Sequence, residues 1–393
     1  MRVIVNTIAI IIMVSVFIGF WALVLSIVKP RANRKWWIVY GLVMAALFIG
    51  NVVYIMYEVE LYGTSVFPFL KLENTGSYGL VMGIFLAIPL LVIVKIVQWL
   101  VNRQVNQLDP AVGQSRRRLF QSAVVAAPVV TIGAAGYGAF IGQQEVVVTE
   151  NKFTYKNLPP SLKNYKIVQL SDVHLGPSID LQDLDELIEL TVKQKPNRVI
   201  ITGDLIDKVQ WLPELCEALR KLAAQVPDGI DCILGNHEHF HDVHEILQAF
   251  KTKTPMRIYM NSNLEIFGAA HGAGQPVYIA GVDYDEKRSS KHRRVMLDEA
   301  LKGIPENAFV ILLAHHPEFM DLAFERNIPL TLAGHTHGGQ IIFDGKMLVP
   351  LSTEYYKGIY TQGNSIGYVN SGTGHWFPIR FNCPREITVI TFK

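Results

Sequence analysis

The sequence predicts an α/β protein in two parts, with four transmembrane helices within residues 1-142 and a layered α/β domain at residues 146-393. Long apolar stretches crowd the first part, and half of all residues are hydrophobic while only 18% are charged. From about Val146, strand-like and helix-like segments alternate, which is typical of layered α/β domains. All 12 histidines lie at or beyond His174, so a histidine-rich site can form only in the second part.

The first part contains four apolar stretches, each able to cross a bilayer with about 20 helical residues. We expect helices at residues 3-28, 36-57, 78-101 and 119-142. The first run is too long for a signal peptide and lacks a clean cleavage pattern, so we expect it to remain as a helix. Because no acidic or arginine pair lies midway through a stretch, we interpret the region as an anchor rather than a transporter or lipid-access vestibule.

The loops between these stretches differ in charge. The loop after the first stretch is basic, and so is the loop after the third, which contains Arg116-Arg117-Arg118. The loop after the second carries Glu58, Glu60 and Glu73 against one cation, Lys71. Because cytoplasmic loops are enriched in Lys and Arg, we expect everything after the fourth helix to lie on the extracytoplasmic side.

The same arginines also resemble a twin-arginine export signal. Ser115-Arg116-Arg117 precedes a mildly apolar stretch that is rich in Ala and Gly. The alternative, that Arg116 and Arg117 only obey the charge rule for loops, stays open. On either interpretation the downstream domain is exported.

In the second part, short apolar runs predict strands, and segments with a helical apolar period predict helices. The expected strands are Lys166–Leu170, Arg198–Thr202, Ile230–Leu234, Val277–Val282, Ala308–Ala314, Leu330–Ala333 and Glu386–Phe392. The expected helices include Leu181–Lys195 and Leu212–Ala224. The three cysteines form no CxxC pair, so we expect buried thiols rather than a disulfide framework.

Side chains that bind metals follow five of these strands. The five segments are Asp172-Val-His174, Gly203-Asp204, Gly235-Asn-His-Glu238, His315 and Gly334-His-Thr-His337. Open α/β sheets form their sites at the carboxyl ends of strands, because loops converge there. Together the segments supply two carboxylates, one carboxamide and four imidazoles, enough for two adjacent metal ions.

These residue types suit a pair of divalent cations. A carboxylate that bridges two cations offsets their repulsion, and Asp204 is the natural bridge. Imidazoles and an amide oxygen suit cations such as Mn, Fe or Zn. Two cations about 3.5–4 Å apart can hold a hydroxide between them and clamp phosphoryl oxygens, while a protonated histidine can donate to the leaving oxygen. The sequence therefore predicts a metal-dependent hydrolase that takes a phosphate ester as substrate.

The same residues form five motifs that resemble those of the calcineurin-like metallophosphoesterases. The motifs are Leu170-Ser-Asp-Val-His174, Thr202-Gly-Asp204, Gly235-Asn-His-Glu238, Leu313-Ala-His315 and Ala333-Gly-His-Thr-His-Gly-Gly-Gln-Ile341. Each motif alone is weak, but all five occur in the family's order over roughly Val146–Lys393. They are most similar to the bacterial membrane-associated branch, which includes phosphodiesterases and UDP-2,3-diacylglucosamine pyrophosphatases. This resemblance implies a multi-pass protein of a bacterial plasma membrane.

The resemblance also implies a four-layer α/β/β/α fold in which two mixed β-sheets lie between helical layers. It implies a first metal site of Asp172, His174, Asp204 and His337, and a second of Asp204, Asn236, His315 and His335. His237 resembles the residue that contacts the phosphate and protonates the leaving group. Asp204 and the metals would activate a metal-bound hydroxide for attack on phosphorus, while Asn236 and His237 stabilise the developing charge.

Several neighbouring residues have open roles. His316 directly follows His315, and alternate strand residues face opposite ways, so the family pattern favours His315 as the ligand. His239 either begins the next helix on its solvent face or lines the substrate entrance. His375 and Arg380 either hold a phosphate or carboxylate of the substrate or only pack beside the last strand.

The leading prediction is a membrane-anchored, binuclear-metal phosphoesterase that acts on a lipid-linked or envelope phosphodiester. One alternative is a metal-dependent nuclease, but a net charge of +2 and the lack of a long basic stripe disfavour nucleic acid. The other is a non-catalytic membrane sensor that binds metal or nucleotide. His237 disfavours it, because a pure binder needs no leaving-group acid. The sequence does not reveal whether the protein has protein partners.

Overall fold

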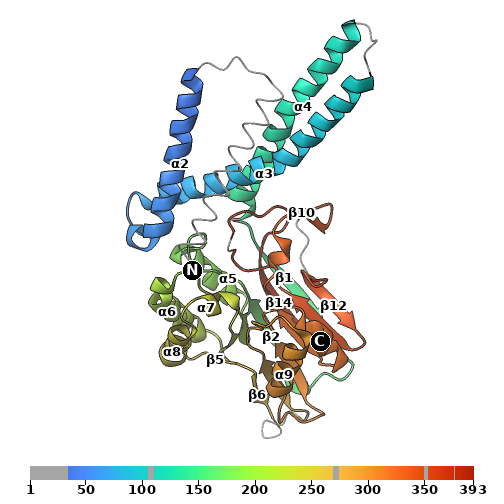
Figure 1. The fold of residues 1–393 in the computed structure, drawn as a ribbon. Helices are drawn as coiled ribbons and strands as arrows, with labels where there is room; N and C mark the ends of the chain where they lie inside the picture. The colour runs from blue at the N-terminus through green and yellow to red at the C-terminus, as the bar shows by residue number, and fades with distance from the viewer. Residues whose placement is uncertain (1–33, 105–109, 269–273, 349–352, 376) are drawn as a thin grey trace. The chain divides into compact units, whose positions relative to one another are not determined.

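The computed structural model describes residues 34–104, 110–268, 274–348, 353–375 and 377–393. The expected helix at residues 3-28 lies outside these residues. The chain divides into two compact units, Met1–Gln143 and Gln144–Lys393, which we call the N-terminal and C-terminal units (Figure 1).

The described part of the N-terminal unit is built from helices. It contains α2 (Arg34–Leu61), α3 (Phe67–Gln104), α4 (Pro110–Tyr137) and a π-helical turn, η1 (Gly138–Gly142). α3 begins well before the expected stretch at residues 78-101. The polar segment before that stretch is helical rather than a loop, because Glu73 accepts hydrogen bonds from Asn51 and Ser77, each at 3.0 Å.

Two helical segments among the described residues are long and apolar enough to cross a membrane, and they suggest membrane association. They are Phe67–Val101 and Arg118–Gly142, which contain the expected stretches at residues 78-101 and 119-142. The expected stretch at residues 36-57 lies within α2 but is not one of these two segments, and many of its side chains lie outside the description. The four-helix membrane region therefore stays a prediction.

α3 and α4 pack together through small and branched apolar side chains. Ile84, Leu91 and Val124 are buried in this contact. Other large apolar side chains of the same helices face outward, including Phe85 and Ile93, which are 57% and 56% exposed. Exposed apolar surface of this kind is typical of a membrane or protein contact.

The C-terminal unit alternates strands and helices. Its strands are β1 (Val146–Phe153), β2 (Lys166–Leu170), β3 (Arg198–Thr202), β4 (Ile230–Ile233), β5 (Arg257–Ile258), β6 (Ser262–Phe267), β7 (Val277–Gly281), β8 (Phe309–Leu313), β9 (Leu330–Ala333), β10 (Ile342–Phe343), β11 (Lys346–Met347), β12 (Gly358–Gln362), β13 (Ser365–Val369) and β14 (Arg385–Phe392). Its α-helices are α5 (Leu181–Lys193), α6 (Leu212–Ala223), α7 (Asn236–Phe240), α8 (Val243–Lys253), α9 (Ser290–Ala300) and α10 (Phe319–Glu325).

The strands form two six-stranded mixed sheets and one short hairpin. The first sheet has the order β1-β14-β2-β3-β4-β5, the second has the order β12-β13-β9-β8-β7-β6, and β10 pairs with β11. In the first sheet β2, β3, β4 and β5 are parallel, and β14 runs antiparallel to β2. In the second sheet β7, β8, β9 and β13 are parallel, whereas the edge strands β6 and β12 are antiparallel to their neighbours.

The main core lies between the two sheets. Ile167 and Ile200 of the first sheet and Ile311 and Leu332 of the second are fully buried in it. Because successive strand residues face opposite sides, Leu312 instead packs outward in a second apolar cluster.

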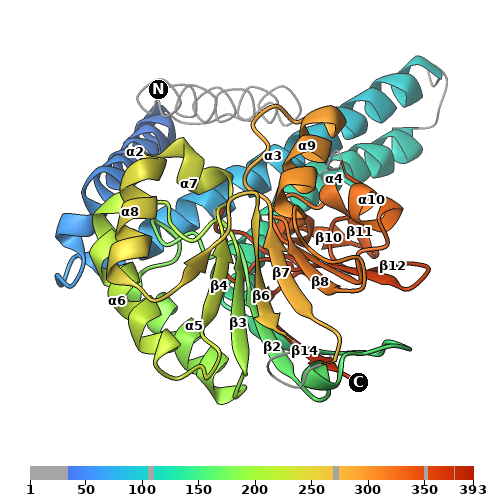
Figure 2. The ribbon, with the colours of Figure 1, turned by 90° about the horizontal axis from the view of Figure 1, so that it is seen from below.

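Helices cover the outer face of each sheet. Leu297 of α9 and Phe319 of α10 lie in the same apolar cluster as Leu312 of the second sheet. Figure 2 shows α9 and α10 beside the second sheet, and α5, α6 and α8 beside the first. The C-terminal unit therefore has the α/β fold with two mixed sheets that the resemblance implies, with helices outside both sheets.

The expected elements agree closely with the observed ones. Each of the seven expected strands is present, with its ends within one residue of the expectation. α5 ends at Lys193 rather than Lys195, where a φ of 51° is incompatible with a helix. The remaining strands, including β1, and helices α7 to α10 were not predicted.

Candidate metal centre

The loops after β2, β3 and β4 of the first sheet meet the loops after β8 and β9 of the second. This junction contains the seven predicted ligands, Asp172, His174, Asp204, Asn236, His315, His335 and His337. His335 is half-buried, and each of the other six is at most 5% exposed. The carboxyl ends of strands in two different sheets thus bring these polar side chains into one buried place.

Five of the seven have a left-handed backbone conformation. The φ angle is 55° at Asp172, His174 and Asp204, 71° at His335 and 50° at His337. Residues other than glycine rarely adopt such angles, and those that do cluster at functional sites where the surrounding structure holds them. The backbone is therefore strained where it directs these side chains toward the junction.

Two glycines let the loops approach this closely. A Cβ atom on Gly334 would lie 2.4 Å from Asp172 Oδ2, and one on Gly235 would lie 2.1 Å from Asp204 Oδ1. Both distances are far below van der Waals contact, so any side chain there would displace a carboxylate.

Asp172, His174 and His337 form a first ligand group. The Nε2 atoms of His174 and His337 are 3.0 Å apart, and Asp172 Oδ1 lies 3.5 Å from His337 Nε2. The Ser171 hydroxyl donates to Asp172 Oδ2 at 2.5 Å and orients that carboxylate. Ligands bound about 2.1 Å from one ion lie about 3.0–3.4 Å apart, so these atoms fit a single cation.

His315, Asn236 and His335 form a second ligand group. His315 Nε2 lies 3.1 Å from Asn236 Oδ1 and 3.2 Å from His335 Nδ1. These separations again match ligands of one cation.

Asp204 connects the two groups. Its Oδ2 atom lies 3.6 Å from His174 Nε2 and 3.2 Å from His315 Nε2. Its Oδ1 atom accepts a hydrogen bond from the main-chain N–H of His237 at 2.8 Å, which fixes the carboxylate plane. One oxygen of Asp204 therefore faces both ligand groups.

The donor set fits divalent cations. His315 Nδ1 lies 2.7 Å from the carbonyl oxygen of Thr202, to which it donates its proton. Its Nε2 atom faces two acceptors, Asp204 Oδ2 and Asn236 Oδ1. Burial opposes the charged form, but Asp204 raises the pKa of His315 to about 10, so Nε2 carries a proton when no cation is bound. A divalent cation would replace that proton and bind the same three atoms.

The charges at the junction compensate one another. Burial acts to raise the pKa of Asp204, but the charges of His315 and His174 outweigh it and hold that pKa well below its usual range. Burial and the nearby charge of His315 lower the pKa of His335 to about 3. Burial and His174 likewise lower the pKa of His337 well below its usual range. Neutral imidazoles of this kind keep the lone pair that binds a metal.

His237 pairs with a carboxylate that the sequence did not single out. Its Nδ1 lies 2.5 Å from Asp207 Oδ1, and the His237 side chain is 22% exposed. Burial acts to lower the pKa of His237, but the hydrogen bond to Asp207 and the charge of Asp204 raise it to about 9. His237 is therefore protonated at neutral pH and accessible from outside the junction.

Glu238, also without a predicted role, holds the two loops together. Its carboxylate accepts hydrogen bonds from the main-chain N–H groups of Asp204, Leu205 and Gly235, at 3.0, 2.6 and 2.8 Å. Burial and the charge of Asp204 raise the pKa of Glu238. Glu238 therefore fixes the backbone of two loops, the one that carries Asp204 and the one that carries Asn236.

Two signals in the sequence could have revealed these carboxylates. Asp207 follows Asp204 by three residues within one short loop, and Glu238 is the last residue of a motif already singled out. Each was missed because its partners come from another loop.

His239 lies beside the junction and does not enter either ligand group. Its Nε2 pairs with Asp283 Oδ1 at 2.9 Å, and its ring centroid lies 5.3 Å from that of Tyr284. Burial opposes the charged form, but Asp283 raises the pKa of His239. His239 thus ties α7 to the loop after β7, and its role at a substrate entrance stays a prediction.

Arg380 is buried and contacts both its own loop and a proposed metal ligand. Its guanidinium donates to the carbonyl oxygens of Ser371, Gly374 and Cys383 at 2.9, 2.7 and 3.0 Å. Its Nη2 atom also lies 3.3 Å from Nδ1 of His337. With no exposed surface, it has no direct access to substrate in this conformation. His375 on the same loop is also buried, at 2% exposed. These contacts favour the packing alternative for both residues.

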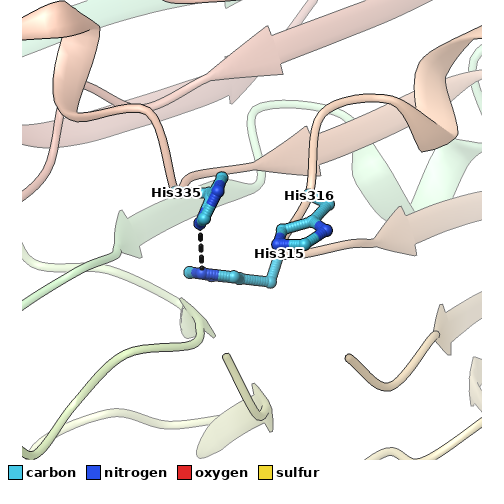
Figure 3. A group of neighbouring side chains, drawn as sticks. All are labelled: His315, His316 and His335. Carbon is cyan, nitrogen blue, oxygen red and sulfur yellow. Dashed lines mark hydrogen bonds between the residues drawn. The ribbon is translucent and has the colours of Figure 1, made fainter. Parts of the chain in front are cut away.

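His316 lies near the second ligand group, although strand alternation predicts the opposite side. β8 ends at Leu313, so His315 and His316 are in the following bend and alternation no longer applies. The centroid of the His316 ring lies 4.1 Å from that of His335 and 5.6 Å from that of His315 (Figure 3). Burial and the charges of His335 and His315 lower its pKa to about 2.

Comparison with known proteins agrees with this geometry. The model of the calcineurin-like phosphoesterase family matches residues 165–339. A metallophosphoesterase of Bacillus subtilis, YkuE, is 31% identical over 289 residues, which cover 71% of this chain and 98% of that protein. A metallophosphoesterase of Campylobacter jejuni, Cj0846, is 34% identical over 244 residues, which cover 60% of this chain and 61% of that protein.

A third relative is named as a transmembrane protein. A "transmembrane protein with metallophosphoesterase domain" of Danio rerio is 30% identical over 277 residues, which cover 68% of this chain and 62% of that protein. The chain thus spans nearly all of the Bacillus relative but about three fifths of the other two.

A dimetal phosphatase structure from Danio rerio is 12% identical with a TM-score of 0.34, covering 59% of this chain and all of that one. That score is too low to support an inference. The family implies metal-dependent hydrolysis of phosphate esters, and this chain belongs to the calcineurin-like metallophosphoesterase family.

Proposed function

We propose that this chain is a membrane-anchored phosphodiesterase that holds two divalent cations in the junction between the two sheets. The observation that carries the proposal is Asp204, whose Oδ2 atom faces His174 Nε2 at 3.6 Å and His315 Nε2 at 3.2 Å. Asp172, His174, Asp204 and His337 would hold one cation. Asp204, Asn236, His315 and His335 would hold the other. Mn, Fe or Zn suits this mixture of carboxylate, amide and imidazole ligands.

The cations would neutralise phosphoryl charge and lower the pKa of water to give a nucleophile. The protein's own residues complete the reaction. Asn236 belongs to the second ligand group, and the His237 ring lies 4.4 Å from the ring of His174 in the first. Both would stabilise charge on the phosphoryl oxygens. Because Asp207 holds Nδ1 of His237, the opposite nitrogen, Nε2, would deliver the proton to the leaving-group oxygen.

The surface beside His237 supports an apolar leaving group. Phe240 is 56% exposed, and its ring centroid lies 5.3 Å from that of His237 and 6.5 Å from that of Tyr284. Phe240 and Tyr284 thus form an aromatic wall next to the proposed acid, and such rings pack against acyl or aryl groups. Exposed Arg288 contributes a positive field at His316 and His335, which favours an anionic phosphate.

The membrane location supports the same substrate class. Two helical segments are able to cross a bilayer, and relatives of this chain are named as transmembrane proteins. We place the C-terminal unit on the extracytoplasmic side of a bacterial plasma membrane, from the charge of the loops. A lipid-linked phosphodiester, such as that of a UDP-diacylglucosamine, would be within its reach.

The two alternatives fit less well. A nuclease needs a basic track for a polyanion, and the aromatic wall beside His237 offers none. A sensor without turnover has no use for a protonated, accessible His237 held by Asp207.

The test uses the full chain in detergent, stripped of metal with a chelator and then re-supplied with Mn²⁺, Zn²⁺, Fe²⁺ or Mg²⁺. Release of nitrophenol is followed from bis(p-nitrophenyl) phosphate and from p-nitrophenyl phosphate. We expect metal-dependent turnover that favours the diester and is lost in Asp204→Asn. His237→Ala should lower turnover of an alkyl phosphodiester, whose leaving group needs an acid, much more than turnover of the nitrophenyl esters. Failure of the unmodified chain to bind metal would rule out the proposal, and binding without turnover of either ester or a lipid diester would favour the sensor.

A further inference from the structure

His316 is an imidazole near the centre to which neither the two predicted metal sites nor the proposed acid gives a role. It follows the end of β8, and its ring centroid lies 4.1 Å from that of His335 and 5.3 Å from that of Tyr284. The Tyr284 ring meets it edge to face, at an angle of 87°. Figure 3 shows the rings of His315 and His335 joined by a hydrogen bond, with His316 beside them.

The nitrogens of these three rings are close enough to share an ion. One ring nitrogen from each of His315, His316 and His335 lies within 4.8 Å of the other two. Two ligands on opposite sides of an ion with bonds of about 2.1 Å lie about 4.2 Å apart. Side-chain rotations that move each ring nitrogen by a few tenths of an ångström would therefore bring all three nitrogens to one cation.

Burial of the His316 imidazole destabilises the fold unless its nitrogen binds a hydrogen-bond partner or a cation. It is only 5% exposed, and its Nε2 atom has no hydrogen-bond partner among the described residues. A buried nitrogen without a partner destabilises the fold, whereas an apolar side chain of the same size would fill the space without that cost. The His316 ring lies beside two imidazoles whose nitrogens, His315 Nε2 and His335 Nδ1, are 3.2 Å apart.

We propose that His316 is an additional ligand for the cation held by His315 and His335, which would give that site a third imidazole. The inference rests on the proposed two-metal centre and assigns it one more residue. A third imidazole would distinguish the second site from the first in both affinity and preferred metal, because nitrogen-rich sets favour Zn²⁺ and Co²⁺ over Mg²⁺ and Ca²⁺.

The test measures metal binding directly. The full chain in detergent is stripped of metal and titrated with Zn²⁺, and separately with Co²⁺, by calorimetry and visible absorption. In His316→Gln we expect affinity for one of the two ions to fall by at least about tenfold, with a changed Co²⁺ spectrum. Affinity for the other ion should stay unchanged, which also shows that the variant is folded. Tyr284→Leu is the matched control, since it removes the ring that packs on His316 but no imidazole.

Each outcome decides the inference. A loss at one site in His316→Gln but not in Tyr284→Leu would support the ligand role. Unchanged affinity for both ions would overturn it and leave the two-metal proposal intact. An equal loss in both variants would show that His316 acts only by packing. Unchanged metal affinity with a raised KM would make it a substrate contact instead. If the unmodified chain binds fewer than two ions, the two-metal proposal itself fails.

Discussion

Nδ1 of His237 lies 2.5 Å from Oδ1 of Asp207, and the same carboxylate lies 3.3 Å from Nδ1 of His174. One half-buried side chain thus orients both a proposed metal ligand and the proposed leaving-group acid. Asp207 is only three residues beyond Asp204, so a single short loop carries the proposed bridging carboxylate and this second anchor.

Asp207→Asn should move the alkaline limit of activity to lower pH. Asp207 helps to hold the pKa of His237 near 9, so its loss lets that pKa fall toward the usual 6.5. The acid form is then depleted from about pH 7 upward rather than only above pH 9. The pH profile of kcat with an alkyl phosphodiester measures the shift. Bis(p-nitrophenyl) phosphate is the control, because nitrophenolate leaves with little need of an acid. Equal profiles for the variant and the unmodified chain would contradict the assignment.

Asp204→Asn and Asn236→Ala should affect metal binding differently. Asp204 faces both ligand groups, whereas Asn236 Oδ1 approaches only His315, at 3.1 Å. We expect Asp204→Asn to weaken both ions by at least about tenfold and Asn236→Ala to weaken one. Calorimetric titration with Zn²⁺ after chelation measures both. If Asn236→Ala weakens both ions equally, the division into two sites is wrong.

Glu238→Gln should destabilise the fold more than it alters the chemistry. The buried carboxylate accepts main-chain hydrogen bonds from Asp204, Leu205 and Gly235, and the amide group of glutamine cannot accept them all. We expect a loss of about 2–3 kcal/mol in the free energy of unfolding. Thermal unfolding followed by circular dichroism measures it. Glu217→Gln is the control, since Glu217 lies on the exposed face of α6 with Arg220. Equal melting temperatures for the two variants would refute the role.

Arg380→Met should lower stability without changing substrate affinity. The guanidinium is buried and donates to carbonyl oxygens of its own loop, so methionine leaves those acceptors unpaired. We expect a loss of more than about 2 kcal/mol. Melting temperature and KM are measured side by side. A raised KM at an unchanged melting temperature would instead place Arg380 in the substrate site.

Phe240→Ala should raise KM for diesters with long acyl or aryl leaving groups and leave short alkyl diesters unaffected. The ring is 56% exposed, so its removal should change stability by no more than about 0.5 kcal/mol. KM values for a series of increasing chain length measure the effect. Phe343→Ala is the control, because Phe343 is 70% exposed on β10 and has no described contact with His237. A chain-length dependence that survives in Phe240→Ala would remove the support for an apolar leaving group.

Local patterns were enough to place the seven proposed ligands. Each follows an apolar run that forms a strand. A residue that follows a strand in the sequence also lies at the carboxyl end of that strand in the fold. Asp172, Asp204 and His315 could therefore be assigned to strand ends, and the junction brings them within reach of one another. The two mixed sheets agree with the resemblance that the same motifs carry.

Only the tertiary structure decided which side chains and loops contact each proposed ligand. Asp207 and Glu238 act on loops other than their own, and Arg380 is enclosed by carbonyl groups of its loop. Strand alternation gave the wrong side for His316, because β8 ends two residues before His315. Periodicity reports which way a side chain faces within one element. It carries no information about which loop of a second sheet packs against that side chain, because such contacts join residues that are far apart along the chain.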